Sequence, residues 1–213
     1  MNEKVRKRFS ELSTGVISDA LDRLGIRGGP STVFPIVIGV KMVGPAVTLR
    51  QVVSKTSEKL IRHTEVLDNI AEKGDVIVID AGGRKDVATW GGILTLRARM
   101  KGIAGVVIDG ATRDVKEIKE LGLPVFAVAS IPVGSTMRYE TVSINEPIQC
   151  GGVVVRPGDA IIGDDDGVIN VPQNKVEETL EIAERFAEVE KKWVEALKKG
   201  VSFAEAARKY PKI

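Results

Sequence analysis

The side chains best suited to chemistry are Arg113 and Asp114, which follow the apolar run "GVVIDG" and open the helical stretch "DVKEIKELG". Loops that follow buried strands often carry function, so this pair is a candidate site. A guanidinium suits two-point binding of a carboxylate, and a carboxylate is a hard oxygen ligand for Mg²⁺ or Mn²⁺. A structural alternative explains Asp114 as a helix N-cap with Glu117 as its capping-box partner, but it leaves Arg113 unexplained.

A second candidate segment lies earlier in the chain, in "DAGGRKDVATWGGILTLRA". An apolar run ends there, a glycine-containing loop is expected next, and a helix begins at the glycine pair. The first N–H groups of a helix lack partners within the helix, and the positive end of the helix dipole attracts anions. We therefore expect a carboxylate ligand between these amides and Arg113, whereas the alternative is a tight strand-to-helix turn. The predicted substrate-binding residues are Gly91, Gly92, Ile93, Leu94 and Arg113.

Alternating strands and helices in the middle of the chain would position these residues. The runs "DVIVIDA", "AGVVIDG" and "PVFAVAS" are apolar throughout and are separated by helical segments. This pattern is typical of parallel strands buried on both faces. The strand ends at Asp80 and Asp109 are expected to be neighbours in the sheet. A further strand, "MVGPAVTLRQVV", and a helix over roughly residues 57 to 72 precede them.

The flanking segments predict helices before this unit and short strands after it. The first helices are interrupted at Ser13, a predicted N-cap. From residue 140 onward, "TVSINEPIQCGGVVVRPGDAIIGDDDGVINVP" predicts a β meander, and Asp166-Gly167 favours a hairpin turn over a calcium loop. We expect an α/β fold with a mixed sheet.

Residues 173–213 predict a C-terminal helical extension of one domain that spans residues 1–213. Asn174 is the predicted cap of a long amphipathic helix, Gly200 ends it, and a capping-box pattern at Ser202 begins a short final helix. The apolar stripe of the long helix must pack against this subunit or a neighbouring one.

Composition narrows the function classes. The 213 residues carry 31 basic and 29 acidic side chains, so no strong field favours nucleic acid or an anionic membrane. No apolar run approaches the roughly 20 residues of a membrane span, and no signal core is visible, so a cytoplasmic protein is expected. The single cysteine, Cys150, is expected to be buried and inert. The single histidine, His63, is expected to have a helix-surface or packing role. With one histidine and one cysteine, a conventional zinc site is not expected.

Two long stretches resemble a known enzyme family. "GGILTLRARMKGIAGVVIDGATRDVKEIKELGLPVFA" and "CGGVVVRPGDAIIGDDDGVINVP" resemble class II 4-hydroxy-4-methyl-2-oxoglutarate / 4-carboxy-4-hydroxy-2-oxoadipate aldolases. That family includes the regulator of ribonuclease activity A, and members have been labelled demethylmenaquinone methyltransferase-like. The resemblance covers nearly the whole chain. It implies a three-layer β/β/α fold of the swivelling type and a homotrimer or hexamer with sites at subunit interfaces.

The resemblance also implies roles for particular residues. Arg113 would bind the pyruvoyl carboxylate, Asp114 would be the direct ligand of Mg²⁺ (or Mn²⁺), and the amides around Gly92, Ile93 and Leu94 would hold the substrate. An acidic residue from the neighbouring subunit's C-terminal helix would complete the site through water. The best match for this residue is Glu190, and the fallback is Glu188. The family's aldolases carry an acidic residue where this chain has Gly92, which predicts less efficient aldol cleavage.

Together these observations predict a metal-dependent lyase that acts on a small 2-oxo dicarboxylic or tricarboxylic acid and releases pyruvate. A metal ion would polarise the 2-oxo group and stabilise the enolate, and metal-bound hydroxide is the candidate base. Oxaloacetate decarboxylation would pass through the same enolate. The alternative is a non-catalytic protein that binds an RNA-processing enzyme. Methyl transfer is disfavoured because we find no convincing nucleotide-binding fingerprint.

Overall fold

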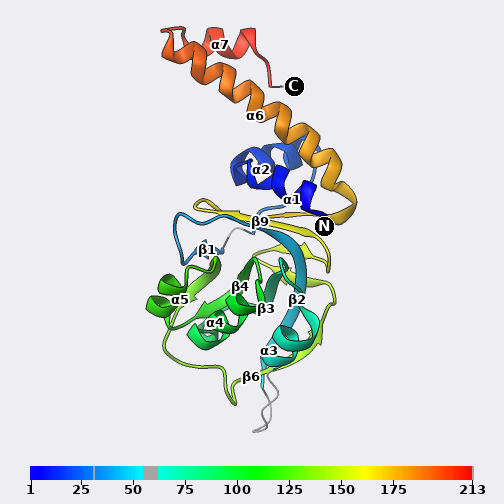
Figure 1. Cartoon of the computed structure of the whole chain (residues 1–213), viewed down its shortest axis with the longest axis vertical. Coiled ribbons are helices and arrows are strands. Elements are labelled where there is room, and N and C mark those ends of the chain that lie inside the picture. Colours follow the sequence, from blue (N-terminus) through cyan, green and yellow to red (C-terminus); the bar gives the residue numbers. More distant parts are fainter. Residues whose placement is uncertain (31, 55–61, 213) are drawn as a thin grey trace.

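The computed structural model describes residues 1–30, 32–54 and 62–212 and shows a layered α/β body with a projecting helical arm (Figure 1). The strands are β1 (Phe34–Pro35), β2 (Met42–Val53), β3 (Val76–Trp90), β4 (Gly105–Thr112), β5 (Val125–Ser130), β6 (Tyr139–Ile144), β7 (Ile148–Cys150), β8 (Val153–Val155), β9 (Ala160–Asp164) and β10 (Gly167–Val171). The helices are α1 (Glu3–Ser10), α2 (Thr14–Arg23), α3 (His63–Glu65), the π-helix η1 (Val66–Ile70), α4 (Gly92–Lys101), α5 (Val115–Leu121), the 3₁₀ turn η2 (Gln173–Lys175), α6 (Val176–Lys198) and α7 (Phe203–Lys209).

The main sheet has the strand order β1-β5-β4-β3-β2-β9-β10, with β6 paired to β2. Strands β2 to β5 are parallel, as their continuous apolar runs predict, and Asp80 lies opposite Asp109 in the register. Apolar side chains of η1, α4 and α5 cover one face of the sheet. The β7–β8 pair covers the other face, where Ile148 and Cys150 pack against Phe126. This arrangement confirms the predicted β/β/α layers and the buried position of Cys150, whose thiol pKa is raised by burial.

Strand β3 is longer than the sequence pattern predicts. A loop was expected after Asp80, but the strand continues to Trp90 with register shifts after Asp80, Arg84 and Ala88. Such bulges bend a strand while keeping it paired to its neighbour. As a result, Trp90 lies beside Thr112 at the end of β4. The two segments that carry the candidate residues therefore meet at one edge of the sheet.

Strand β2 is shared by the two parts of the body. Its first residues pair with β9 in antiparallel fashion, its middle pairs with β3, and its end pairs with β6. The β9–β10 hairpin pairs Asp164 with Gly167, which confirms the predicted hairpin. Its two turn residues are Asp165 and Asp166, one position earlier than the predicted Asp166-Gly167, because Gly167 already belongs to β10. Helices α1, α2 and the first half of α6 pack on this part of the sheet, where Phe9, Ile17 and Leu180 are fully buried.

Most helix boundaries follow the predicted signals. The Ser13 hydroxyl accepts a hydrogen bond from Val16 N at 3.2 Å, and Ser202 caps α7. The predicted cap at Asn174 is wrong, because residues 173–175 form a 3₁₀ turn and α6 begins at Val176 without a side-chain cap. The second half of α6 leaves the body and carries α7, which folds back on it (Figure 1).

The helix predicted over roughly residues 57 to 72 is only partly described. Residues 57–61 lie outside the described residues, and the described part runs from His63 to Ile70. It ends there because Ala71 adopts an extended conformation. Within the ranges that the structure describes, no helix has the length and apolar character needed to cross a bilayer.

Candidate functional site

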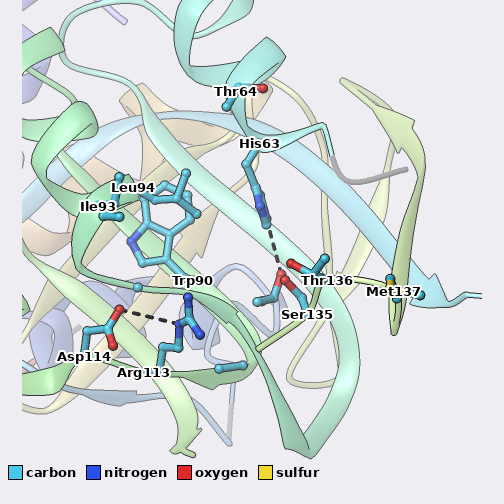
Figure 2. Close-up of a pocket in the computed structure, with 13 residues that line it drawn as sticks. His63, Thr64, Trp90, Ile93, Leu94, Arg113, Asp114, Ser135, Thr136 and Met137 are labelled. Atoms are coloured by element: carbon cyan, nitrogen blue, oxygen red, sulfur yellow. Dashed lines mark hydrogen bonds and ion pairs between the residues drawn. The ribbon is translucent and has the colours of Figure 1, made fainter. Parts of the chain in front are cut away.

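A cavity of about 320 Å³ opens at the carboxyl ends of β3 and β4 (Figure 2). Cavities of this size are typical of sites for small molecules. The structure brings both candidate segments to this cavity, together with residues from α3 and from the segment after β5. The lining residues are His63, Thr64, Ala88, Thr89, Trp90, Gly91, Ile93, Leu94, Arg113, Asp114, Ser135, Thr136 and Met137.

Asp114 does not cap α5 with its side chain. Its backbone is left-handed (φ 58°, ψ 41°), which is costly for a residue other than glycine. Its Oδ2 atom instead accepts a hydrogen bond from Gly92 N at 3.0 Å and lies 3.5 Å from Arg113 Nε. The side-chain capping alternative is therefore wrong. The expectation of a free amide at Gly92 is also wrong, because Asp114 occupies it.

Two glycines make room for this ion pair. A Cβ atom on Gly91 would lie 2.5 Å from Asp114 Oδ2 and 3.2 Å from Arg113 Cγ. A Cβ atom on Gly134 would lie 2.8 Å from Arg113 Nη1. The guanidinium is thus enclosed between backbone segments while half of the side chain stays open to the cavity. The sequence offered no local signal for Gly134, which comes from a distant loop.

Trp90 forms a rigid wall of the cavity. Its indole is 2% exposed and donates a hydrogen bond from Nε1 to Thr95 Oγ1 at 2.9 Å. The Thr95 hydroxyl in turn donates to Gly91 O. The Trp90 carbonyl accepts from Arg113 N at 3.0 Å and from the Thr112 hydroxyl. The backbone that presents Arg113 is therefore tied to the wall against which a ligand would pack.

His63 lies in a buried polar network beside this wall. It is 4% exposed and packs edge-on against Trp90, with ring centroids 5.8 Å apart. This geometry agrees with the packing role expected for it, although the sequence did not place it at the cavity. Burial lowers the pKa of His63 to about 4, so the ring is neutral at neutral pH.

The network orients the imidazole. The Thr89 hydroxyl donates to the Gln51 side-chain carbonyl, which leaves the Gln51 amide group 3.0 Å from His63 Nε2. Because an amide NH₂ group can only donate, Nε2 accepts and the ring proton lies on Nδ1. The dashed line at His63 in Figure 2 marks its 3.3 Å contact with the hydroxyl of Thr89.

Among the described lining residues, Asp114 supplies the one carboxylate that could hold a metal ion in the cavity. Asp114 Oδ1 has no hydrogen-bond partner among the described residues. The described part of the chain also contains no cluster of three or more Asp, Glu, His or Cys side chains that could hold a metal ion. Mg²⁺ often keeps several water ligands and uses one or two carboxylates, so the donor set fits this ion. Glu190 and Glu188 lie on α6, away from this chain's cavity, and pair with Lys212 and Lys191. Their contribution from a neighbouring subunit stays a prediction.

A family model and several known proteins match this chain. The family model described as RraA-like (Aldolase/RraA) matches residues 14–170. A Halalkalibacterium halodurans protein named "Putative 4-hydroxy-4-methyl-2-oxoglutarate aldolase" is 39% identical over 178 residues, which cover 84% of this chain and 81% of that protein. Protein DlpA of Legionella pneumophila is 31% identical over 194 residues, which are 91% of this chain and 32% of DlpA.

A solved structure is similar over most of the chain. It is RraAS2 of Streptomyces coelicolor, described as an unusual member of the RNase ES inhibitor RraA protein family. The two chains are 30% identical and superpose with a TM-score of 0.81 over 90% of this chain and 96% of that chain. The layers seen here are therefore those of that protein family.

Proposed function

Because the chain belongs to the RraA-like (Aldolase/RraA) family, we propose that it is a divalent-metal-dependent lyase that cleaves a 4-hydroxy-2-oxo acid and releases pyruvate. One observation carries the proposal: Arg113 and Asp114 face the same cavity, and the Asp114 carboxylate is turned away from the helix that it precedes. The name of the H. halodurans relative supports 4-hydroxy-4-methyl-2-oxoglutarate as the first substrate to test. The 4-carboxy-4-hydroxy-2-oxoadipate type is the close variant, and oxaloacetate decarboxylation is the proposed second activity.

The residues of this chain have distinct tasks in that reaction. Arg113 binds the C1 carboxylate of the substrate through paired N–H groups, and Trp90 and Leu94 exclude water from one side of the carbon chain. Cleavage breaks the C3–C4 bond, and the C4 hydroxyl loses its proton and becomes a carbonyl. The electron pair stays on the three-carbon fragment, which takes a proton at C3 and leaves as pyruvate. Asp114 would hold Mg²⁺ (or Mn²⁺), which supplies Lewis-acid polarisation of the 2-oxo group when bound.

We extend the proposal to a homotrimer or hexamer in which a neighbouring arm completes the site. Helix α4 presents an apolar stripe beside the cavity, and the tip of the arm presents another at the opposite end of the molecule (Figure 1). The exposed apolar residues are Ile93, Leu96 and Met100 on α4 and Val194, Leu197 and Phe203 on the arm. Contact between the two stripes would bring the neighbour's Glu190, or Glu188, toward Asp114. Light scattering tests this assembly, and a monomer would contradict it.

The activity test measures pyruvate release from 4-hydroxy-4-methyl-2-oxoglutarate and from oxaloacetate. Each reaction is run with Mg²⁺, with Mn²⁺ and after EDTA, using the wild type, Asp114→Ala and Arg113→Ala. We expect the wild type to release pyruvate, EDTA to abolish this activity and added metal to restore it. Asp114→Ala should be inactive, and Arg113→Ala should be active only with a raised KM. Full turnover by Arg113→Ala would refute the assigned carboxylate contact.

A second function, regulation of an RNA-processing enzyme by binding without catalysis, is favoured by two observations. The chain resembles RraAS2, and it has Gly92 where the family's aldolases carry an acidic residue. Inhibition of RNA cleavage by a purified endoribonuclease of the RNase E type measures this function. Inhibition that Asp114→Ala retains, together with no pyruvate release under either metal, would favour binding over catalysis.

A further inference from the structure

A second cavity, of about 400 Å³, adjoins the first, and Met137 lines both. Figure 2 shows Met137 on the side of the first cavity away from Asp114. The charged residues that line the second cavity are Arg84, Asp86 and Arg138. The segment that follows Val133 therefore borders both the cavity that contains Arg113 and the cavity that contains the other two arginines.

Among the described residues that line the second cavity, Arg138 is the charged residue without an ionic partner. Arg84 and Asp86 neutralise each other through an ion pair, with Arg84 Nε 3.0 Å from Asp86 Oδ1. Arg138 donates one hydrogen bond, from Nη1 to the Gly134 carbonyl at 3.0 Å. No acidic group among the described residues lies within 4.0 Å of its guanidinium. Arg138 thus keeps both its charge and several N–H groups available for an anion.

Gly134 joins the two arginines. Arg113 Nη1 lies 2.8 Å from the position of a Cβ on Gly134, and Arg138 Nη1 lies 3.0 Å from the carbonyl oxygen of the same residue. Standard bond lengths within Gly134 then place the two Nη1 atoms no more than about 10 Å apart. An extended five-carbon diacid has carboxylate carbons roughly 5 Å apart, and each charged hydrogen bond adds about 2.8 Å. A molecule of this size can therefore reach both guanidinium groups.

We propose that Arg138 binds the second carboxylate of the substrate and makes the site selective for 2-oxo diacids over monoacids. The proposal deepens the proposed function and rests on it, because Arg113 is taken to hold the first carboxylate. If Arg138 merely fixed the turn through Gly134, its loss would weaken the binding of diacids and monoacids alike. Only a direct contact weakens the diacid alone.

Calorimetric titration in Mg²⁺ tests the contact with two ligands of equal chain length, 2-oxoglutarate and 2-oxopentanoate. The wild type should bind the diacid at least about tenfold more tightly, as expected for a charge-assisted hydrogen bond. Arg138→Gln should abolish this difference and leave the Kd of the monoacid unchanged, whereas Arg138→Lys should keep part of it. Arg156→Gln is the matched control, because Arg156 is exposed and lies outside both cavities. It should behave as the wild type.

The outcomes separate this inference from the proposed function. Selective diacid binding without pyruvate release from any substrate would support the role of Arg138 and refute the lyase. Pyruvate release with an unchanged diacid preference in Arg138→Gln would support the lyase and overturn the role of Arg138. Binding of neither ligand, or an equal loss for both, would also overturn it.

Discussion

The burial of His63 makes the stability of the folded chain depend on pH in a way that one substitution should remove. The imidazole has an ordinary pKa of 6.5 and a pKa of about 4 in the folded protein, because burial disfavours its charged form. Between these two values the unfolded chain binds a proton that the folded chain does not. Stability from this group is therefore fully present above pH 6.5 and is lost as the pH falls toward 4.

The magnitude follows from the shift. Each unit of pKa difference corresponds to about 1.4 kcal/mol, so the free energy of unfolding should fall by about 2 kcal/mol between pH 7 and pH 5 through His63 alone. By pH 4 the loss should reach about 3 kcal/mol. Carboxyl groups also titrate in this range, so the effect of His63 must be isolated by comparison with a variant.

Urea denaturation followed by circular dichroism, at pH 7, 6, 5 and 4.5 and at fixed protein concentration, makes the comparison. His63→Gln cannot take up this proton. Between pH 7 and pH 5 the free energy of unfolding of the variant should therefore fall by about 2 kcal/mol less than that of the wild type. Each protein is compared with itself at pH 7, so a difference in stability between the two proteins at that pH does not affect the result. Parallel pH profiles for wild type and variant would refute the assignment of a buried neutral imidazole.

Three further substitutions test the site and the core. Gly91→Ala should lower kcat/KM for pyruvate release by at least about tenfold, because its Cβ would lie 2.5 Å from Asp114 Oδ2; wild-type activity would contradict the geometry. Asp109→Asn should stabilise the protein at pH 7, because burial raises the pKa of Asp109 and its ionisation opposes folding. Denaturation midpoints should show this gain shrinking toward pH 4. Gly163→Ala should cost about 1–3 kcal/mol in a thermal or urea melt, because its Cβ would lie 2.7 Å from Phe126 Cζ; an unchanged melt would refute that contact.

The sequence predicts those parts of the fold whose signals are local. Apolar runs define the inner strands, and the hydroxyl of Ser13 marks a helix start, because each depends on residues close together in the chain. The predicted cap at Asn174 is wrong because the start of α6 is determined by a contact with a residue distant in the sequence. The buried carboxylate of Asp159 accepts a hydrogen bond from Gln173 N at 3.0 Å and thereby holds the entry to α6 in a tighter turn.

For the candidate site, too, the sequence predicts only the features that depend on residues close together in the chain. Residue type and spacing identify Arg113 and Asp114, and the structure brings them to one cavity with the start of α4. The positions of His63 and Gly134 depend on packing between segments far apart in the chain, which no local pattern encodes. The continuation of β3 to Trp90 likewise depends on pairing with β4. The sequence therefore identifies two candidate residues of the cavity but not the distant segments that enclose them.

The shared strand β2 has a consequence for how the molecule comes apart. Its backbone amides and carbonyls are divided among β9, β3 and β6, so neither part of the sheet can detach without breaking bonds made by this one segment. Local opening of either part therefore exposes the other to solvent. Hydrogen exchange in the middle of β2 should require global unfolding, and the two parts should lose their protection together as a single cooperative unit.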